Sequence, residues 1–350
     1  MGMIDTDAHV FETPRTWEYM EPAEQKFAPR IVEQIYGNER RGLAGNVWKR
    51  YWLVDKTAIS LESNIDPALT KGQRDLEDVD ARVAHMDQLG VDVQVIFPSF
   101  FLHPYTRNQE MEFALTRAYN RWMGDIWKKG KGRLRWIAVP PVLQIAKARA
   151  ELEFARDHGA CGVLMHGIEH ERLLTDPYFF PLYEAADDLG LAITVHAGYN
   201  SPAYEQIFRG AGGMVEFRFP VITAFHNLMM KDIPKQYPNI RWGFIEAGAQ
   251  WVPMVMQDLA VRYRDLLKQE LPKDLFAQRK VYVTCQADDD VPYILKFAGE
   301  DSLVVGTDYG HSDHAADIDV FDFLKHKSGI ERRIVDKIID TNGRRLYGLN

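Results

Sequence analysis

The sequence is poor in cysteine and has no long apolar stretch. Cys161 and Cys285 are the only cysteines in 350 residues, and both lie in apolar runs typical of strands. Two buried thiols fit a reducing compartment better than a disulfide framework, so we expect a cytoplasmic protein. No window approaches the ~18 uninterrupted apolar residues that a membrane-spanning helix needs. The opening residues MGMIDTDAHVFE include acids and no apolar run, so we expect no signal peptide.

Clusters of basic residues are missing as well. The formal net charge is -8 at pH 7, and the lysines and arginines are scattered along the chain. This distribution argues against a nucleic acid or an anionic membrane as the partner, and we expect a small-molecule substrate instead. An acidic protein repels anions at long range, so an anionic substrate would need a local attraction such as a metal ion or an arginine.

Short apolar runs that end in polar or small residues recur eight times along the chain. They are rich in Val and Ile, as buried parallel strands are, and they span residues 3–9, 91–99, 134–142, 161–167, 191–198, 240–248, 281–290 and 302–313. Between them, apolar residues at helical spacing predict helices over 76–90, 109–129, 146–159, 179–190 and 252–269.

Eight strands that alternate with helices predict an α/β fold, a (β/α)8 TIM barrel. An open, doubly wound sheet is the alternative. It is the weaker one because no glycine-rich GxGxxG motif follows any of the predicted strands.

Residues 11–75 do not fit this repeat. They contain four prolines, several tryptophans and tyrosines, and the turn-prone stretch NERRGLAGN. We expect one domain over residues 1–350, in which 11–75 is a long insertion after strand one that folds over the barrel mouth as a lid. The alternative is a surface decoration without contact to the active site.

Polar residues gather at the carboxyl ends of the predicted strands, which share one face of a barrel. Strand one ends in Asp7 and His9, strand five in His196, and strand eight in Asp308. Asp7 and His9 are two residues apart on a strand, so both side chains point to the same side. Two imidazoles and two carboxylates suit Zn²⁺, Mn²⁺ or Fe²⁺ and leave positions open for water and substrate.

Several motifs carry a family resemblance over nearly the whole chain. They are IDTDAHV, ARVAHMDQLGVDVQVIFPS, TVHAG, PNIRWGFIEAGAQWVP, VGTDYGHSD and IIDTNGRRLYGL. With these motifs the chain resembles the amidohydrolase superfamily, in the group of aromatic and muconate-type decarboxylases and related hydrolases. The resemblance implies a TIM barrel and one divalent metal, with Zn²⁺ expected before Mn²⁺ or Fe²⁺. It implies metal ligands at Asp7, His9, His196 and Asp308, and a homo-oligomer, a dimer or a tetramer.

The chain departs from this family pattern in two places. Strand one often carries His-x-His or Glu-x-His, whereas here the shorter Asp7 precedes His9, which predicts a looser or water-mediated contact to the metal. Many relatives carry a histidine at the end of strand six, where this chain has Glu246. The proton-handling role of that histidine is open to Glu246, to His226 from the preceding helix, or to His166 from the end of strand four.

Further residues are candidates for substrate binding and support of the site. Arg50 in the insertion is a candidate partner for a substrate carboxylate, with a solvated arginine as the alternative. We expect His103, His166 and Tyr199 to contact the substrate, and His311 to hold Asp308 or a neighbouring ligand in place. Aromatic residues could form a wall for a flat ring, with packing within the lid as the alternative, namely Trp48, Trp52, Phe100, Phe101 and Tyr199.

These residues lead to one functional hypothesis and two alternatives. The first is non-oxidative decarboxylation of an aromatic or unsaturated carboxylic acid, in which Asp308 delivers a proton to the substrate carbon. The second is hydrolysis of an amide, an ester, a lactone or an activated C–C bond on the same ligands. The third is a metal-free barrel that only binds a ligand. Release of CO₂ distinguishes the decarboxylase from the hydrolase, and a bound metal distinguishes both enzymes from the metal-free barrel.

Overall fold

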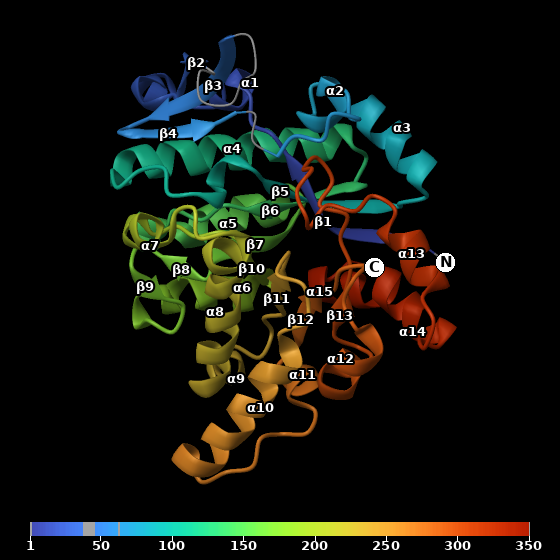
Figure 1. Cartoon of the computed structure of the whole chain (residues 1–350). Helices are drawn as coiled ribbons and strands as arrows, with labels where there is room; N and C mark the ends of the chain where they lie inside the picture. The colour runs from blue at the N-terminus through green and yellow to red at the C-terminus, as the bar shows by residue number, and fades with distance from the viewer. Residues whose placement is uncertain (1, 38–45, 62–63, 350) are drawn as a thin grey trace.

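Eight parallel strands form the centre of the molecule (Figure 1). The computed structural model describes residues 2–37, 46–61 and 64–349. The strands follow one another in chain order around the sheet, and each coincides with one of the eight predicted apolar runs. They are β1 (Ile4–Val10), β5 (Val93–Pro98), β6 (Leu134–Ala138), β7 (Ala160–His166), β10 (Ala192–His196), β11 (Trp242–Ile245), β12 (Val281–Thr284) and β13 (Leu303–Val304).

The sheet closes into a barrel where the chain after β13 runs alongside β1. Thr6 N donates to Val305 O at 3.2 Å, Asp308 N donates to Asp7 O at 2.8 Å, and His9 N donates to Tyr309 O at 2.7 Å. The predicted TIM barrel is therefore confirmed. Only two residues of the predicted strand 302–313 form a regular strand, and the rest joins β1 through these irregular bonds.

Helices follow the strands and cover the outside of the barrel (Figure 1). The segment Val79–Leu89 (α3) shows how local sequence fixes their ends. The Asp78 carboxylate accepts the N–H of Ala81 at its start, and Gly90 ends it in the left-handed conformation with φ of +69°. The other helices that separate strands are α4 (Gln109–Lys129), α5 (Ala148–Asp157), α6 (Phe180–Leu189), α8 (Phe219–Met230), α10 (Val252–Arg262) and α12 (Val291–Ala298).

Shorter helical segments connect these elements. They are η2 (Phe100–Leu102), η3 (Val142–Lys147), η4 (Pro177–Phe179), α7 (Pro202–Phe208), η5 (Met214–Arg218), α9 (Ile233–Gln236), η6 (Tyr263–Leu267) and α11 (Leu275–Gln278). A two-stranded ribbon, β8 (Ile168–Glu169) and β9 (Arg172–Leu173), follows β7. No helix among the described residues combines the length and apolarity that crossing a bilayer requires.

The insertion between β1 and α3 has secondary structure of its own. Its antiparallel sheet consists of β2 (Arg30–Gly37), β3 (Asn46–Val54) and β4 (Thr57–Ser60), and short helices flank it, namely α1 (Pro14–Trp17), η1 (Pro22–Phe27) and α2 (Lys71–Arg74). Trp17 and Trp52 anchor it, because Trp17 packs edge-on against Trp52 and against Phe100 of η2. The predicted turn at 38–46 falls almost wholly outside the described residues, as does the Trp48 side chain.

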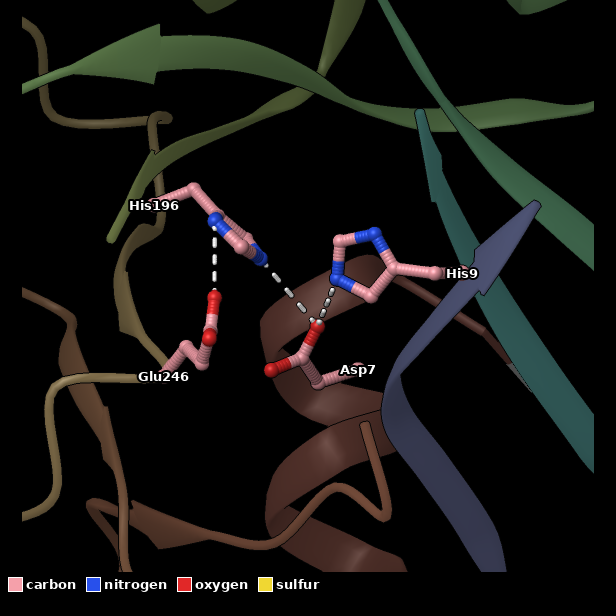
Figure 2. A group of neighbouring side chains, drawn as sticks. All are labelled: Asp7, His9, His196 and Glu246. Carbon is pink, nitrogen blue, oxygen red and sulfur yellow. Dashed lines mark hydrogen bonds and ion pairs between the residues drawn. The ribbon is translucent and has the colours of Figure 1, made fainter. Parts of the chain in front are cut away.

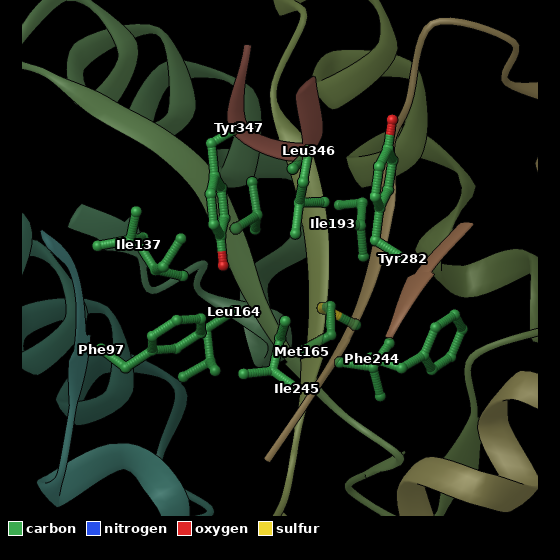
Figure 3. Packing of buried hydrophobic residues seen from close by; sticks show 14 of the residues in the cluster. Phe97, Ile137, Leu164, Met165, Ile193, Phe244, Ile245, Tyr282, Leu346 and Tyr347 are labelled. Carbon is green, nitrogen blue, oxygen red and sulfur yellow. The ribbon is translucent and has the colours of Figure 1, made fainter. Parts of the chain in front are cut away.

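Four helical segments follow β13, and the last of them closes the barrel at the end opposite the strands' carboxyl termini. They are α13 (Val320–His326), α14 (Arg332–Asp336), η7 (Lys337–Thr341) and α15 (Asn342–Tyr347). The Tyr347 hydroxyl donates to Thr6 O at 2.8 Å, and Arg241 Nε donates to Leu346 O at 2.7 Å. Figure 3 shows Leu346 between Tyr347 on one side and Ile193 and Tyr282 on the other.

Truncation of Leu346 tests this closure. Leu346 is fully buried, whereas Leu266 on η6 is 64% exposed. Leu346→Ala should lower the free energy of unfolding by about 2–5 kcal/mol because it removes buried methyl groups and leaves a cavity. Leu266→Ala should change it by less than about 0.5 kcal/mol. Chemical denaturation of both variants measures the difference, and equal losses would contradict the assigned packing.

Candidate metal centre

The residues predicted as metal ligands lie together at the carboxyl ends of the strands. Asp7 and His9 belong to β1, His196 is the last residue of β10, and Asp308 follows β13. Glu246 follows β11 and joins the group. Figure 2 shows Asp7, His9, His196 and Glu246 pointing toward one another from these separate elements. The barrel thus brings together residues that are 300 positions apart in sequence.

Asp7 lies between the two histidines. Its Oδ1 is 3.4 Å from His9 Nε2 and 3.3 Å from His196 Nε2. Asp308 approaches from the other side, with its Oδ1 3.4 Å from the same His9 Nε2. One imidazole nitrogen therefore faces two carboxylates, and all four side chains are buried.

The other face of His196 is fixed by a backbone carbonyl. His196 Nδ1 is 2.8 Å from Ala197 O, and a carbonyl oxygen can only accept a hydrogen bond. The carboxylates of Glu246 and Asp7 outweigh the effect of burial and raise the pKa of His196 to about 9. When a cation makes the ring neutral, its proton lies on Nδ1 and the Nε2 lone pair is free to bind that cation. Glu246 Oε2 is 3.2 Å from the same Nδ1. This carboxylate occupies the place of the missing strand-six histidine.

Two of the acids have unusual backbone conformations. Glu246 has φ of +64° and Asp308 has φ of +52°, in the left-handed region that residues with side chains rarely adopt. Hydrogen bonds hold both in place: Thr284 Oγ1 accepts the N–H of Glu246 at 2.7 Å, and Asp7 O accepts that of Asp308 at 2.8 Å. Strain of this kind persists where the surrounding structure enforces it, and it concentrates at functional sites.

The donor set fits a divalent cation. Both ring nitrogens of His9 and the Oδ2 of Asp308 are buried without a hydrogen-bond partner among the described residues. One ligand atom from each of Asp7, His9, His196 and Glu246 can be chosen so that all four lie within 4.8 Å of one another. Buried polar atoms without partners are costly, and nitrogen and carboxylate oxygen atoms at this spacing are what a metal ion would satisfy.

The electrostatics of the cluster favour a cation as well. Burial raises the pKa of Asp308 well above its usual value, and the charge of Asp7 raises it further. Burial also raises the pKa of Glu246 well above its usual value, and the charge of Asp308 raises it further. Burial and nearby His311 lower the pKa of His9 to about 3, so that its ring stays neutral and can act as a ligand.

A pocket of about 420 Å³ opens above this cluster. Glu246, His311 and Asp313 line it at the metal-ligand side, and the insertion supplies much of its remaining wall. The apolar side chains that line it include Phe11, Trp52, Ile59, Leu61, Leu102 and Phe217. Its volume lies within the range of small-molecule sites.

Comparison with known proteins agrees with this geometry. A family model described as amidohydrolase matches residues 4–349. The chain belongs to the amidohydrolase family. Enzymes of this family are metal-dependent lyases or hydrolases, and this amidohydrolase is one of them. A search of curated proteins found no match.

Solved structures share the fold at low sequence identity. An amidohydrolase from Mycobacterium avium subsp. paratuberculosis is 17% identical with a TM-score of 0.76, and the match covers 99% of each chain. The 5-carboxyvanillate decarboxylase of Sphingomonas paucimobilis is 17% identical with a TM-score of 0.69, over 100% of this chain and 99% of that one. A dihydroxybenzoic acid decarboxylase from Polaromonas, solved with manganese and 2-nitroresorcinol, is 17% identical with a TM-score of 0.63, over 99% and 97%.

The structure places the predicted substrate-binding residues in two groups. Arg50 and His103 line the pocket. His166 and Tyr199 are buried behind it, where His166 Nδ1 is 2.8 Å from Glu169 Oε1 and the Tyr199 hydroxyl donates to Glu216. Phe100 and Phe101 of the predicted aromatic wall pack into the core instead of lining the pocket.

His226 does not lie at the site. It is on α8, outside the barrel, and its Nε2 is 2.9 Å from Asp258 Oδ2 on α10. The apolar residues around it form the buried side of α8, whereas His226 itself is only half-buried and faces α10. Its predicted catalytic role therefore has no geometric basis, and Glu246 is left as the candidate in contact with the cluster.

Supporting residues surround the ligands, and sequence reasoning found only one of them. His311, the predicted one, has its Nδ1 2.7 Å from Asp308 Oδ1 and its Nε2 3.1 Å from Ser99 Oγ. Asp5 accepts hydrogen bonds from both the N–H and the hydroxyl of Thr307, and Arg82 donates to His9 O. The Asp5 and Arg82 contacts join β1 to distant parts of the chain, so no local signal in the sequence indicated them.

Substitution of a histidine ligand tests the centre directly. His196→Gln should lower the metal content of the purified protein to below about a tenth of the wild-type value, because a neutral amide replaces a nitrogen ligand. The matched control is Asp258→Asn, which changes an acid outside the barrel and should leave metal content unchanged. Elemental analysis by mass spectrometry gives both values. Full metal content in His196→Gln would remove this residue from the ligand set.

Proposed function

We propose that this amidohydrolase is a metal-dependent, non-oxidative decarboxylase of an aromatic or unsaturated carboxylic acid. The observation that carries the proposal is the pocket, whose apolar side chains stand above buried carboxylates and imidazoles suited to a divalent ion. Asp7, His9, His196 and Asp308 would hold that ion. When bound, it would supply a Lewis acid for the substrate carboxylate and a neighbouring hydroxyl or enol oxygen.

Asp308 is the residue that we assign to proton transfer. Its Oδ1 is held by His311, while its Oδ2 has no hydrogen-bond partner among the described residues. In the proposed reaction the carboxyl acid of Asp308 gives its proton to the substrate carbon that carries the carboxylate. The C–C bond to that carboxylate then breaks, CO₂ leaves, and its bonding electrons return to the ring or the double bond.

The insertion acts in this proposal as the lid predicted from the sequence. Trp52, Ile59 and Leu61 come from its sheet or follow it, and they line the pocket opposite the strand ends. Apolar walls exclude water from the reacting carbon and provide a surface for a flat substrate. Arg50, on β3 of the same sheet, lines the pocket and in this proposal would meet the substrate from the lid.

Hydrolysis is the second candidate, because the same ligands could activate water. The observation that favours it is Glu246, a carboxylate in the pocket wall beside His196 that could accept a proton from water. A metal-free binding barrel is less consistent with the structure, since it would leave the nitrogens of His9 buried without a partner among the described residues.

The metal, the assembly and the location are parts of the same proposal. Zn²⁺ was the first expectation, but the manganese in the Polaromonas structure makes Mn²⁺ the first ion to test. Exposed apolar side chains on α8 and α10, namely Phe219, Met254 and Val261, support the expected homo-oligomer. The cytoplasmic location stays a prediction from the two cysteines.

A substrate panel tests the reaction. The Mn²⁺-loaded enzyme should release CO₂ from at least one hydroxybenzoate or unsaturated acid and should leave amides, esters and lactones intact. Asp308→Asn should lower this release by at least about 10³-fold, because the amide cannot donate a carboxyl proton. A coupled enzymatic assay for CO₂ measures its release by the wild type and by the Asp308→Asn variant. Turnover of a lactone or amide without any CO₂ release would replace the decarboxylase proposal with the hydrolase.

A further inference from the structure

The joint between the insertion and the barrel contains a buried carboxyl group. Glu12 lies between β1 and α1, the first helix of the insertion, and it is 6% exposed. Its Oε2 accepts the N–H of Phe100 on η2 at 2.9 Å, and η2 follows the barrel strand β5. Its other oxygen, Oε1, is buried and has no hydrogen-bond partner among the described residues. One oxygen of Glu12 thus connects the start of the lid to the barrel, and the other is unsatisfied.

The surroundings of Glu12 are mostly aromatic. Trp17 of α1 packs against Phe100 with ring centroids 5.0 Å apart, and Phe101 packs against Tyr119 of α4 at 5.5 Å. Two more buried polar atoms at this joint, Trp17 Nε1 and the Tyr119 hydroxyl oxygen, have no hydrogen-bond partner within the described part of the chain. Such atoms are costly in the closed joint and would be hydrated in an open one, so they lower the free energy of opening.

Groups that could balance a negative charge on Glu12 are engaged elsewhere. On α2 and at its end, Arg74 Nε is 2.7 Å from Asp75 Oδ1, and Lys71 pairs with a neighbouring glutamate. Tyr119 is the titratable group that faces Glu12 from α4, and burial keeps it neutral by raising its pKa. The side chains of η2 are all apolar. Burial outweighs the backbone hydrogen bonds and, together with Asp75, raises the pKa of Glu12 to about 8.

Other polar contacts between the insertion and α4 remain in contact with solvent. The Tyr19 hydroxyl donates to Asp125 Oδ2 at 2.8 Å, and Arg117 Nη2 donates to Glu24 Oε2 at 2.6 Å. The Asp125 side chain is 44% exposed, and pairs of this kind contribute little to stability. The buried joint around Glu12 is therefore the contact at which a change of charge would affect the position of the lid most strongly.

We propose that Glu12 is a pH-dependent latch, which holds the lid on the barrel while its carboxyl group is neutral and releases the lid when this group becomes charged. In the closed state the charge would be buried beside aromatic rings without a cation. In the open state water would solvate it. The inference concerns access to the pocket, and it does not depend on which reaction takes place there.

The direction of the pH dependence follows from the two states. In the open state the pKa of Glu12 returns towards its ordinary value of 4.5, whereas in the closed state it is about 8. Between these values the open state releases the proton and the closed state keeps it. The ratio of open to closed lid should therefore rise by up to about tenfold per pH unit between roughly pH 4.5 and 8, and it should be constant above this range.

Hydrogen–deuterium exchange of the Mn²⁺-loaded enzyme, followed by mass spectrometry, tests the latch without any substrate. The probes are peptides that cover α1 and η2, and rates are corrected for the intrinsic pH dependence of amide exchange. The opening constant of the wild type should rise at least about tenfold between pH 5.5 and pH 7.5. In Glu12→Gln it should stay constant, because an amide does not ionise.

Glu18→Gln is the matched control, since Glu18 is an exposed acid at the end of α1 in the same insertion. This variant should keep the pH dependence of the wild type. A wild type whose opening constant does not change with pH would overturn the latch, and this result needs no variant. The same pH dependence in Glu12→Gln would overturn it too, as would an equal loss of protection in β7, which would indicate global unfolding.

The outcomes also separate this inference from the decarboxylase proposal. If no acid releases CO₂ but the opening of the lid depends on pH through Glu12, the decarboxylase fails and the latch stands. If CO₂ is released by an enzyme whose lid opens equally at every pH, only the inference about Glu12 is wrong.

Discussion

Carboxylates that repel one another are buried together at one end of the barrel, and the proposed metal centre follows from this repulsion. Asp7, Asp308 and Glu246 come together with His9 and His196. Burial and the neighbouring acids destabilise the charged forms of Asp308 and Glu246, whereas the two histidines lower the pKa of Asp7 and keep it charged. Such a group is stable when protons or a cation balance its charge. A divalent ion would do so and would also bind His9 Nε2, which has no hydrogen-bond partner among the described residues. The need for a cation and the capacity for Lewis-acid chemistry therefore have one physical origin.

The barrel is what enforces this proximity. Closure by hydrogen bonds between β1 and the chain after β13 places Asp308 against Asp7, and it holds Asp308 in a left-handed conformation. Thr284, on the neighbouring strand β12, accepts the N–H of Glu246 and holds that residue in its left-handed conformation. At the opposite end, α15 seals the barrel with Leu346 and Tyr347. The well-packed interior stabilises the strained backbone of Asp308 and Glu246 at the carboxyl ends of the strands. The insertion then supplies much of the wall of the pocket that opens above these side chains.

Local patterns in the sequence predicted the repeat and the candidate ligands. The eight apolar runs are long enough to be distinct, and Asp7, His9, His196 and Asp308 each lie at or near the carboxyl end of a strand. Residues that act through long-range contacts were missed. Arg82 reaches His9 across 73 positions, and Asp5 contacts Thr307 across 302 positions. His226 was misplaced because an apolar run shows that a helix is buried on one side, but not which neighbour each residue faces.

A crystal structure of the protein grown with Mn²⁺, with diffraction data collected at the manganese absorption edge, tests the central claim most directly. The account predicts one strong anomalous peak in contact with Asp7, His9, His196 and Asp308, at the distances typical of metal ligands. A peak bound elsewhere, or Mn²⁺-replete crystals without a peak among these four side chains, would contradict it.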